Sequence, residues 1–169
     1  MRTVASTHRH FAFVLASLIS VTACRLPSAS PTSPGSASDG ATDVHADALY
    51  CVAEINKYRT AAGLPAFEHM QALEDFGHEA ARVDGEAHEF HKHFYATGGG
   101  GVSRAQNEIP WWSLSRYGSV REIVRQGIKM QWDEGPGGYH YETLFGSYKY
   151  VGCGIANVNG EITVTHDFR

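Results

Sequence analysis

Positive charge is scarce in this sequence. Its 169 residues include 14 Lys and Arg against 18 Asp and Glu, which gives a formal net charge of −4 at pH 7. Nucleic acids are bound through clustered Lys and Arg, so this balance argues against a nucleic-acid partner. It also offers no polybasic surface to anionic lipid headgroups. The glycines from Gly98 to Gly101 lack the Lys and Ser or Thr that complete a phosphate-binding loop, and we interpret them as a mobile linker.

A long apolar run is also missing. The stretch FAFVLASLIS, which begins at Phe11, is too short to be a comfortable transmembrane helix. Arg2 and Arg9 precede it and small residues follow, which is the pattern of a removable export signal. The signal ends in VTAC at residues 21–24, which resembles the lipobox of bacterial lipoproteins, where the chain is cut before a lipidated Cys. This resemblance implies a signal peptide over residues 1–23 and lipidation of Cys24, and the alternative is an ordinary signal peptide with an incidental Cys24.

Lipidation of Cys24 implies an exported protein that is anchored to a membrane at the cell envelope, because each buried CH₂ of an acyl chain contributes ~0.8 kcal/mol. The residue two places after Cys24 is Leu26 and not Asp. By the sorting rule for such lipoproteins, this favours the outer membrane if the host is Gram-negative. The segment 24–43 is rich in Ser, Pro, Ala and Gly, so it predicts a flexible tether after the lipidated Cys24. Residues 44–169 remain for one domain.

The domain changes its hydrophobic period near its C-terminus. Helical spacing predicts helices over residues 47–61 and 70–83, and a third begins after Ser119, which forms a capping-box pattern with Glu122. Residues 88–117 predict a long region rich in loops. Residues 150–158 and 161–168 predict two strands joined by Asn159-Gly160, and alternation in the second strand predicts that one of its faces is buried. Helices followed by a hairpin indicate an α+β fold.

Cysteine is scarce as well, with three residues in the chain. If Cys24 carries the lipid, then Cys51 and Cys153 form an even pair in an oxidising compartment, and we expect a disulfide between them. Two buried free thiols are the alternative, because a bridge requires Cα atoms roughly 4.4–6.8 Å apart. A closed loop of about a hundred residues would stabilise the fold by about 4–5 kcal/mol in the chain-entropy model.

Histidines cluster in two places. His88, His91 and His93 fall within six positions, and His140 follows the third predicted helix. Grouped histidines suggest a metal site, but a run of surface His is more often solvated, so His88 and His93 alone are interpreted as surface residues. The stretch HEAAR at 78–82 lacks the second His of the zinc-protease helix motif, which excludes that site.

Several short motifs occur together in a familiar order. They are INKYRTAAGLP, then QNEIPWW, then MQWDEGPGGYHY, and finally YVGCGIANVNGEITVTHDF. In this order and spacing the chain resembles the CAP superfamily, also called the SCP domain, which includes cysteine-rich secretory proteins, insect venom antigens and plant pathogenesis-related proteins. The likeness extends from Leu49 to Phe168. It implies an extracellular α-β-α sandwich with three main helices, a C-terminal antiparallel hairpin, and a cleft lined by two His and two Glu.

The resemblance also implies which residues line that cleft. His91 matches the first His, His140 the second, and Glu134 the acidic residue after the third helix. The remaining acidic position is open between two residues, because the family's Gly-Glu-Asn is replaced here by Ala-Gln-Asn-Glu at 105–108. Alignment on the Asn places Gln106 there, whereas Glu108 restores the carboxylate, and we choose Glu108.

Two imidazoles, His91 and His140, would hold a divalent ion, most naturally zinc. Binding would be weak, because two protein ligands and waters form an open site. We expect a cell-surface binding module for a lipid, peptide or protein ligand, since the family is implicated in such binding and its cleft has no obvious nucleophile. The alternative is a metal-dependent hydrolase in which Glu108 or Glu134 acts as general base. A structural surface protein with a vestigial cleft is the third possibility.

Overall fold

The computed structural model describes residues 39–169 of the chain, with side chains from Val44 onward. The predicted export signal, Cys24 and the tether as far as residue 38 lie outside the described residues, so those predictions stay predictions. The elements, in chain order, are α1 (Asp39–Ala61), β1 (Glu68–His69), α2 (Gln71–Ala87), α3 (Lys92–Thr97), η1 (Gly98–Gly101), β2 (Ala105–Ser113), α4 (Leu114–Tyr117), α5 (Val120–Asp133), α6 (Tyr139–Phe145), β3 (Tyr150–Val158) and β4 (Glu161–Phe168).

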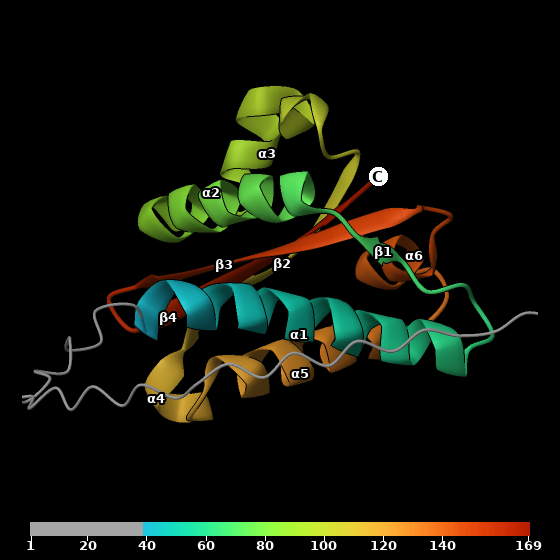
Figure 1. The fold of residues 1–169 in the computed structure, drawn as a ribbon, viewed down its shortest axis with the longest axis horizontal. Helices are drawn as coiled ribbons and strands as arrows, with labels where there is room; N and C mark the ends of the chain where they lie inside the picture. The colour runs from blue at the N-terminus through green and yellow to red at the C-terminus, as the bar shows by residue number, and fades with distance from the viewer. Residues whose placement is uncertain (1–38) are drawn as a thin grey trace, which may run out of the picture. The chain divides into compact units, whose positions relative to one another are not determined.

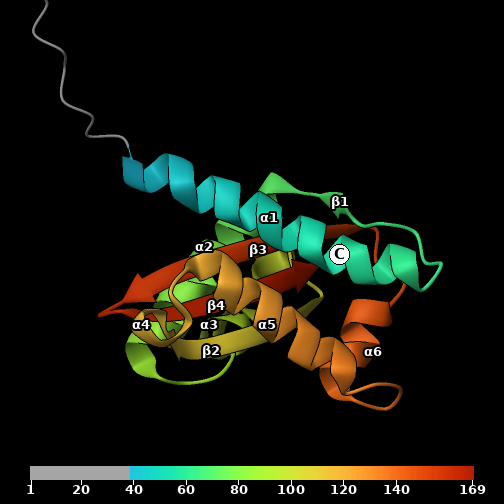
Figure 2. The ribbon, with the colours of Figure 1, turned by 90° about the horizontal axis from the view of Figure 1, so that it is seen from below.

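A four-stranded sheet in the order β1-β3-β4-β2 forms the middle layer. β4 pairs antiparallel with both β2 and β3, and the short β1 adds to β3 in parallel. α2 and α3 lie on one side of the sheet, and α1, α4 and α5 lie on the other, as Figure 1 shows. Figure 2, seen from below, shows α1 and α5 running across the sheet with α6 beside them. The predicted α+β sandwich is confirmed.

The C-terminal hairpin has the predicted bounds. Asn159 and Gly160 adopt left-handed backbone angles, with φ of 54° and 87°, as a tight two-residue hairpin turn requires. The prediction that one face of the second strand is buried is confirmed, but the other face is buried as well. Thr165 and Asp167, on this second face, are 0 % exposed because α2 covers them. Hairpin periodicity alone does not reveal a covering helix.

Close contact between α2 and the sheet depends on two glycines. A Cβ on Gly77 of α2 would lie 2.8 Å from the backbone nitrogen of Gly154, and one on Gly154 would overlap the backbone of Gly77. Thr165 Oγ1 donates a hydrogen bond to the carbonyl oxygen of Gly77 at 3.1 Å across the same contact. The absence of both side chains therefore allows the helix to lie directly on the sheet.

The helix boundaries depart from the predictions at three points. α1 begins at Asp39, inside the segment 24–43 that was predicted as tether, rather than at residue 47. α2 continues past Gly85 to Ala87. Gly85 lies on the buried face of the helix, where its lack of a side chain allows close contact with Thr163 of β4. The region 88–117 is not mainly loop, since it contains β2 and three short helices. The predicted cap of α5 is confirmed, because Ser119 Oγ accepts a hydrogen bond from the Glu122 backbone N–H at 3.2 Å.

A disulfide links α1 to β3. Cys51 and Cys153 are both 0 % exposed and are bonded to each other, with Cα atoms 6.2 Å apart, so the predicted pairing is confirmed. The bridge lies in an apolar core between the sheet and the layer of α1 and α5. The largest fully buried apolar side chains of this core are Ile55, Ile109, Ile123, Ile128, Leu144, Ile162 and Phe168. Among residues 39–169, no helix combines the length and apolar character needed to cross a membrane.

Candidate functional site

His91 lies at the turn from α2 into α3, with a left-handed φ of 53°. Its ring Nδ1 is 2.8 Å from Gln106 Oε1 on β2, and its backbone N–H donates to Glu108 Oε2 at 2.8 Å. An amide oxygen only accepts, so Nδ1 of His91 carries the proton. The Nε2 lone pair is then available, on a side chain that is 16 % exposed.

The structure places both candidates for the first acidic position beside His91. Gln106 contacts the imidazole ring directly, whereas Glu108 mainly binds the backbone, with Oε2 3.6 Å from Nδ1. Burial raises the pKa of Glu108 to about 7, and the negative charges of Asp84 and Asp167 raise it further. The hydrogen bond from the His91 backbone lowers this pKa but does not cancel the effect of burial. The immediate partner of the ring is therefore an amide, and the nearest carboxyl group titrates near neutrality.

The second histidine is held by its predicted carboxylate. Glu134, which follows α5, accepts from His140 Nδ1 through Oε1 at 2.6 Å and from the His140 backbone N–H through Oε2 at 3.0 Å. Burial raises the pKa of Glu134, but the hydrogen bonds and charge of His140 outweigh it and the net pKa is lowered. An ionised Glu134 fixes the proton on Nδ1 of His140, and Nε2 of this ring is also left as a lone pair.

Three consecutive residues of β2 connect the two histidines. Gln106 and Glu108 bind His91 on the side of α2, and Asn107 points the opposite way, where its Nδ2 donates to the His140 carbonyl oxygen at 3.0 Å. β2 is an edge strand of the sheet. His91 and His140 therefore attach to the same short segment of one edge strand, from its two faces.

The sequence reasoning missed a group of buried acids beside His91. Asp84 and Asp167 are both 0 % exposed. Burial raises the pKa of Asp84, and burial raises the pKa of Asp167 to about 7 despite hydrogen bonds from Ser103, Gln106 and Thr165. Asp167 alternates with the apolar residues of its strand, and no local signal in the sequence indicates that it is buried. Its burial follows from the packing of α2.

The other two histidines of the HEFHKH stretch do not join this arrangement. His88 stacks on Trp111, with ring centroids 5.0 Å apart, and its Nε2 lies 3.0 Å from a carboxylate oxygen of Glu161. His93 packs against the ring of Phe76 and donates its backbone N–H to Asp84. The rings of His88 and His93 therefore contact side chains other than His91 and His140.

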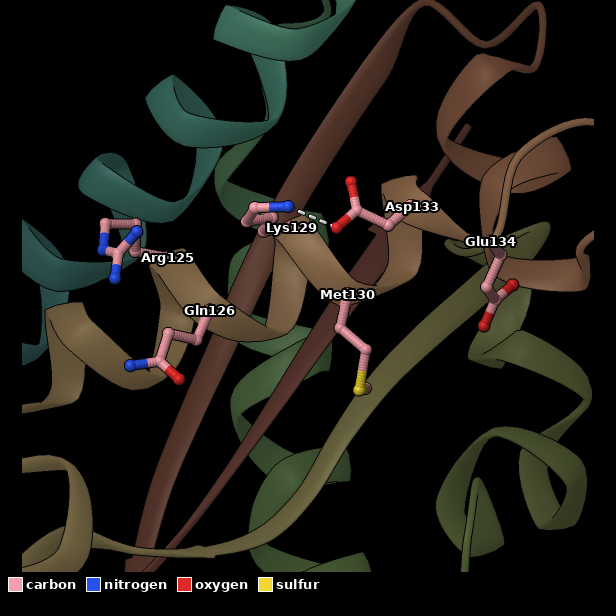
Figure 3. Close-up of a pocket in the computed structure, with 6 residues that line it drawn as sticks. All are labelled: Arg125, Gln126, Lys129, Met130, Asp133 and Glu134. Atoms are coloured by element: carbon pink, nitrogen blue, oxygen red, sulfur yellow. Dashed lines mark hydrogen bonds and ion pairs between the residues drawn. The ribbon is translucent and has the colours of Figure 1, made fainter.

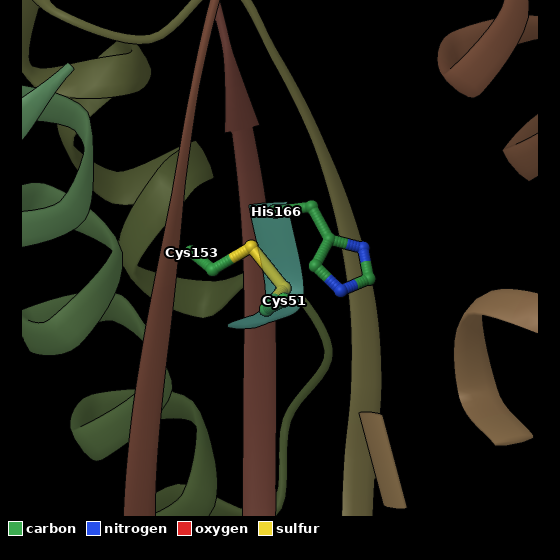
Figure 4. Close-up of side chains that lie close together, drawn as sticks. All are labelled: Cys51, Cys153 and His166. Atoms are coloured by element: carbon green, nitrogen blue, oxygen red, sulfur yellow. A yellow bond between two sulfur atoms is a disulfide. The ribbon is translucent and has the colours of Figure 1, made fainter. Parts of the chain in front are cut away.

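Cys51, Cys153 and His166 also lie close together, as Figure 4 shows. Their potential ligand atoms lie within 4.8 Å of one another, but the two sulfur atoms are bonded to each other and are not thiolates. The His166 ring is fully buried, and burial together with the charge of His140 lowers its pKa to about 3. In the disulfide form these residues are part of the core and not a metal centre.

A shallow groove of about 600 Å³ runs along the exposed side of α5 and reaches Glu134. Figure 3 shows the six side chains that line it, which are Arg125, Gln126, Lys129, Met130, Asp133 and Glu134. Lys129 and Asp133 form an ion pair within the groove, and Arg125 pairs with Glu122 beside it. Met130 is 49 % exposed and contributes the apolar surface. The groove and the His140 site therefore share one residue, Glu134.

Comparison with known proteins identifies the family. No curated protein matches this chain. The model of the CAP family, described as the cysteine-rich secretory protein family, matches residues 52–168, which is well over half of the sequence and contains His91, Glu134 and His140. The matched span runs from α1 to the end of β4, so it includes every layer of the sandwich. The chain belongs to the cysteine-rich secretory protein (CAP) family.

Proposed function

We propose that this protein is an exported, lipid-anchored binding module whose cleft takes a divalent ion, most naturally zinc, at His91 and His140. The observation that carries the proposal is that the two imidazole rings have the same hydrogen-bonding arrangement. Each Nδ1 is bound to an oxygen acceptor, Gln106 Oε1 or Glu134 Oε1, and each Nε2 is left as a lone pair. Metal-binding histidines are usually oriented in this way by a second hydrogen bond.

The donor set fits a weakly held ion. Two neutral imidazoles suit zinc and similar transition metals, and no thiolate among the described residues accompanies them. Waters or a ligand would complete the coordination. The His91 side chain is 16 % exposed and that of His140 is 31 % exposed, so both are accessible to an ion from solvent.

The carboxylates support binding more than hydrolysis. A general base needs to reach the water that it deprotonates. Both oxygens of Glu134 are occupied by His140, and the side chain of Glu108 is only 1 % exposed. The pKa of Glu108, about 7, suits a general base, but its burial keeps it from a water at the mouth of the site. This favours the binding module over the metal-dependent hydrolase.

The groove along α5 supports a peptide or protein ligand over a lipid. Five of its six lining side chains are polar or charged, and Met130 supplies one apolar contact. These polar groups already have partners within the chain, and an extended peptide could exchange some of those pairs for its own polar groups, whereas an acyl chain offers the charged ends of Arg125 and Lys129 nothing to bind. Because the groove ends at Glu134, a bound peptide would reach the proposed metal site.

Calorimetric titration of the protein with zinc near neutral pH tests this function. We expect modest affinity in the parent, strong loss in His91→Ala or His140→Ala, and a smaller loss in Glu134→Gln. His88→Ala is the matched control and should bind like the parent, because its ring stacks on Trp111. Binding that is equally lost in His88→Ala would move the site to the histidine stretch.

Native mass spectrometry of the protein, purified without added metal, tests the ligand directly. A co-purified peptide that is lost on Met130→Glu would support the groove, and a co-purified lipid would contradict the peptide assignment. Turnover of an ester or peptide substrate that disappears with a chelator and with His140→Ala would support the hydrolase in place of the binding module.

A further inference from the structure

A second cluster of histidine and carboxylate lies away from the cleft, where α1, β1 and α2 meet. Glu74 on α2 accepts from two rings at once. Its Oε1 is 2.8 Å from His45 Nδ1 on α1, and its Oε2 is 2.7 Å from His69 Nε2 on β1. None of these residues contributes to the contacts of His91 or His140.

The local structure explains why a carboxylate is buried here. Glu74 lies in the first turn of α2, where the helix dipole favours a negative charge. Gly152 of β3 has no side chain, and a Cβ there would overlap Leu73 and the backbone nitrogen of Glu74, so the start of α2 lies directly on the strand. The Glu74 side chain is consequently 2 % exposed.

A buried carboxylate needs compensation by charge or by strong hydrogen bonds. Each oxygen of Glu74 has one histidine as its side-chain partner, and neither partner is a permanent cation as Lys or Arg would be. The His45 side chain is 50 % exposed and that of His69 is 24 % exposed. The arrangement therefore places one buried anion behind two imidazoles that are open to solvent.

The potential ligand atoms of the three side chains do not all lie within 4.8 Å of one another, so a shared ion requires the two rings to move closer together. The His45 and His69 ring centroids are 6.1 Å apart and their planes are inclined at 68°. With metal–nitrogen bonds of about 2.1 Å, two imidazoles on one tetrahedral ion would have centroids about 5 Å apart. A closure of about 1 Å is within the reach of the half-exposed His45 side chain.

We propose that His45, His69 and Glu74 form a binding site for a divalent transition-metal cation of the zinc type. Two imidazole nitrogens and one carboxylate bind the ion, and water fills the remaining positions. Imidazole ligands select zinc, copper or nickel over magnesium and calcium. The ion would join the first half of α1 to β1 and to the start of α2. This site is independent of the proposed cleft site.

Titration of the tag-free, metal-depleted full chain in detergent with Co²⁺ tests the site, because tetrahedral Co²⁺ has visible absorption bands, and zinc competition then gives the affinity. The double variant His91→Ala/His140→Ala supplies a background without the cleft. We expect it to bind one equivalent, and binding should weaken by at least about tenfold on adding His45→Ala or His69→Ala. His88→Ala in the same background is the matched control and should leave this binding unchanged.

The outcomes separate this site from the cleft. If the double variant binds nothing, or if His45→Ala and Glu74→Gln leave its affinity unchanged, the proposed site is overturned. If the double variant binds as many ions as the parent, the cleft proposal fails and this one stands. Thermal melts by circular dichroism check folding, and if Glu74→Gln is unfolded, the half-exposed His45→Ala and His45→Gln decide the result.

Discussion

Asn107 and His166 are direct partners across strands β2 and β4, and both are 0 % exposed. Asn107 holds the His140 carbonyl through Nδ2, but its Oδ1 and both ring nitrogens of His166 form no hydrogen bond to a protein atom. The pair therefore connects the backbone of His140 to the core, where His166 lies next to the disulfide. Of the seven buried side-chain polar atoms without a hydrogen-bond partner among the described residues, three belong to this pair.

Replacing His166 by leucine should therefore stabilise the protein, most of all in acid. Burial lowers the pKa of His166 to about 3 from an ordinary 6.5, so the neutral ring contributes stability that is lost as the pH falls below 6.5. We expect His166→Leu to gain about 2 kcal/mol relative to the parent between pH 7.5 and pH 4.5. Urea unfolding at both pH values measures this, and the exposed His88→Leu serves as control. A variant that loses stability equally at both pH values would contradict the prediction.

Asp167 should produce the opposite pH dependence. Its pKa is raised from 3.8 to about 7, so its contribution to stability is fully present below 3.8 and is lost as the pH rises through 7. Asp167→Asn keeps the shape of the protonated acid, and we expect it to gain about 2 kcal/mol relative to the parent between pH 5 and pH 8. Denaturant unfolding at these pH values measures the gain. Asp133→Asn, an exposed change, should show no such trend, and a flat difference for Asp167→Asn would show that this carboxyl is not the titrating group.

Gln106→Glu should strengthen the metal site and weaken the fold. A carboxylate next to Nδ1 would make the His91 ring a better ligand, so zinc should bind several-fold more tightly. The change also removes the amide that donates to Asp167 at 3.0 Å and adds a carboxyl beside Glu108 and Asp167. The expected loss of stability at neutral pH is about 1–3 kcal/mol. Calorimetry and urea unfolding on one preparation test both effects, and unchanged stability would mean that the Gln106 to Asp167 bond contributes little.

Cys24→Ser tests the proposed lipid anchor, because Cys24 lies outside the described residues. Metabolic labelling with a fatty acid should mark the parent, and the variant should lose the label and be released from the membrane fraction. Cys51→Ser is the matched control, because it also removes one cysteine and should keep the label. A label that persists in Cys24→Ser would refute lipidation at this position.

Local signals in the sequence predicted the local features of the fold. The Asn159-Gly160 turn and the Ser119 cap each depend on residues within a few positions, and both are confirmed. β2 was missed because its sequence AQNEIPWWS does not alternate and contains a proline near the irregularity between Ile109 and Trp112. Strand pairing with β4 determines this element, and a window of residues does not contain that information.

The site was only partly predictable for the same reason. His91, His140 and Glu134 were predicted as site residues through their motifs, and the structure shows which groups contact the two rings. The sequence did not indicate whether Gln106 or Glu108 contacts the His91 ring, because this depends on the position of β2. The bonds from Glu74 to His45 and His69 join residues 29 and 5 positions apart on different elements, and no motif marks them.

The disulfide also has a mechanical consequence. A pull on the N-terminal end of the described domain enters the fold through α1 and reaches Cys51, which is bonded to Cys153 on β3. The chain between these two residues, with a sequence separation of 102, cannot extend under that load while the bond is intact. An extended chain spans about 3.4 Å per residue, so the disulfide prevents roughly 350 Å of chain extension. Under tension between the two ends of the chain, only the residues before Cys51 and after Cys153 would lengthen, and the strand and loops that carry His91 and His140 would not be extended.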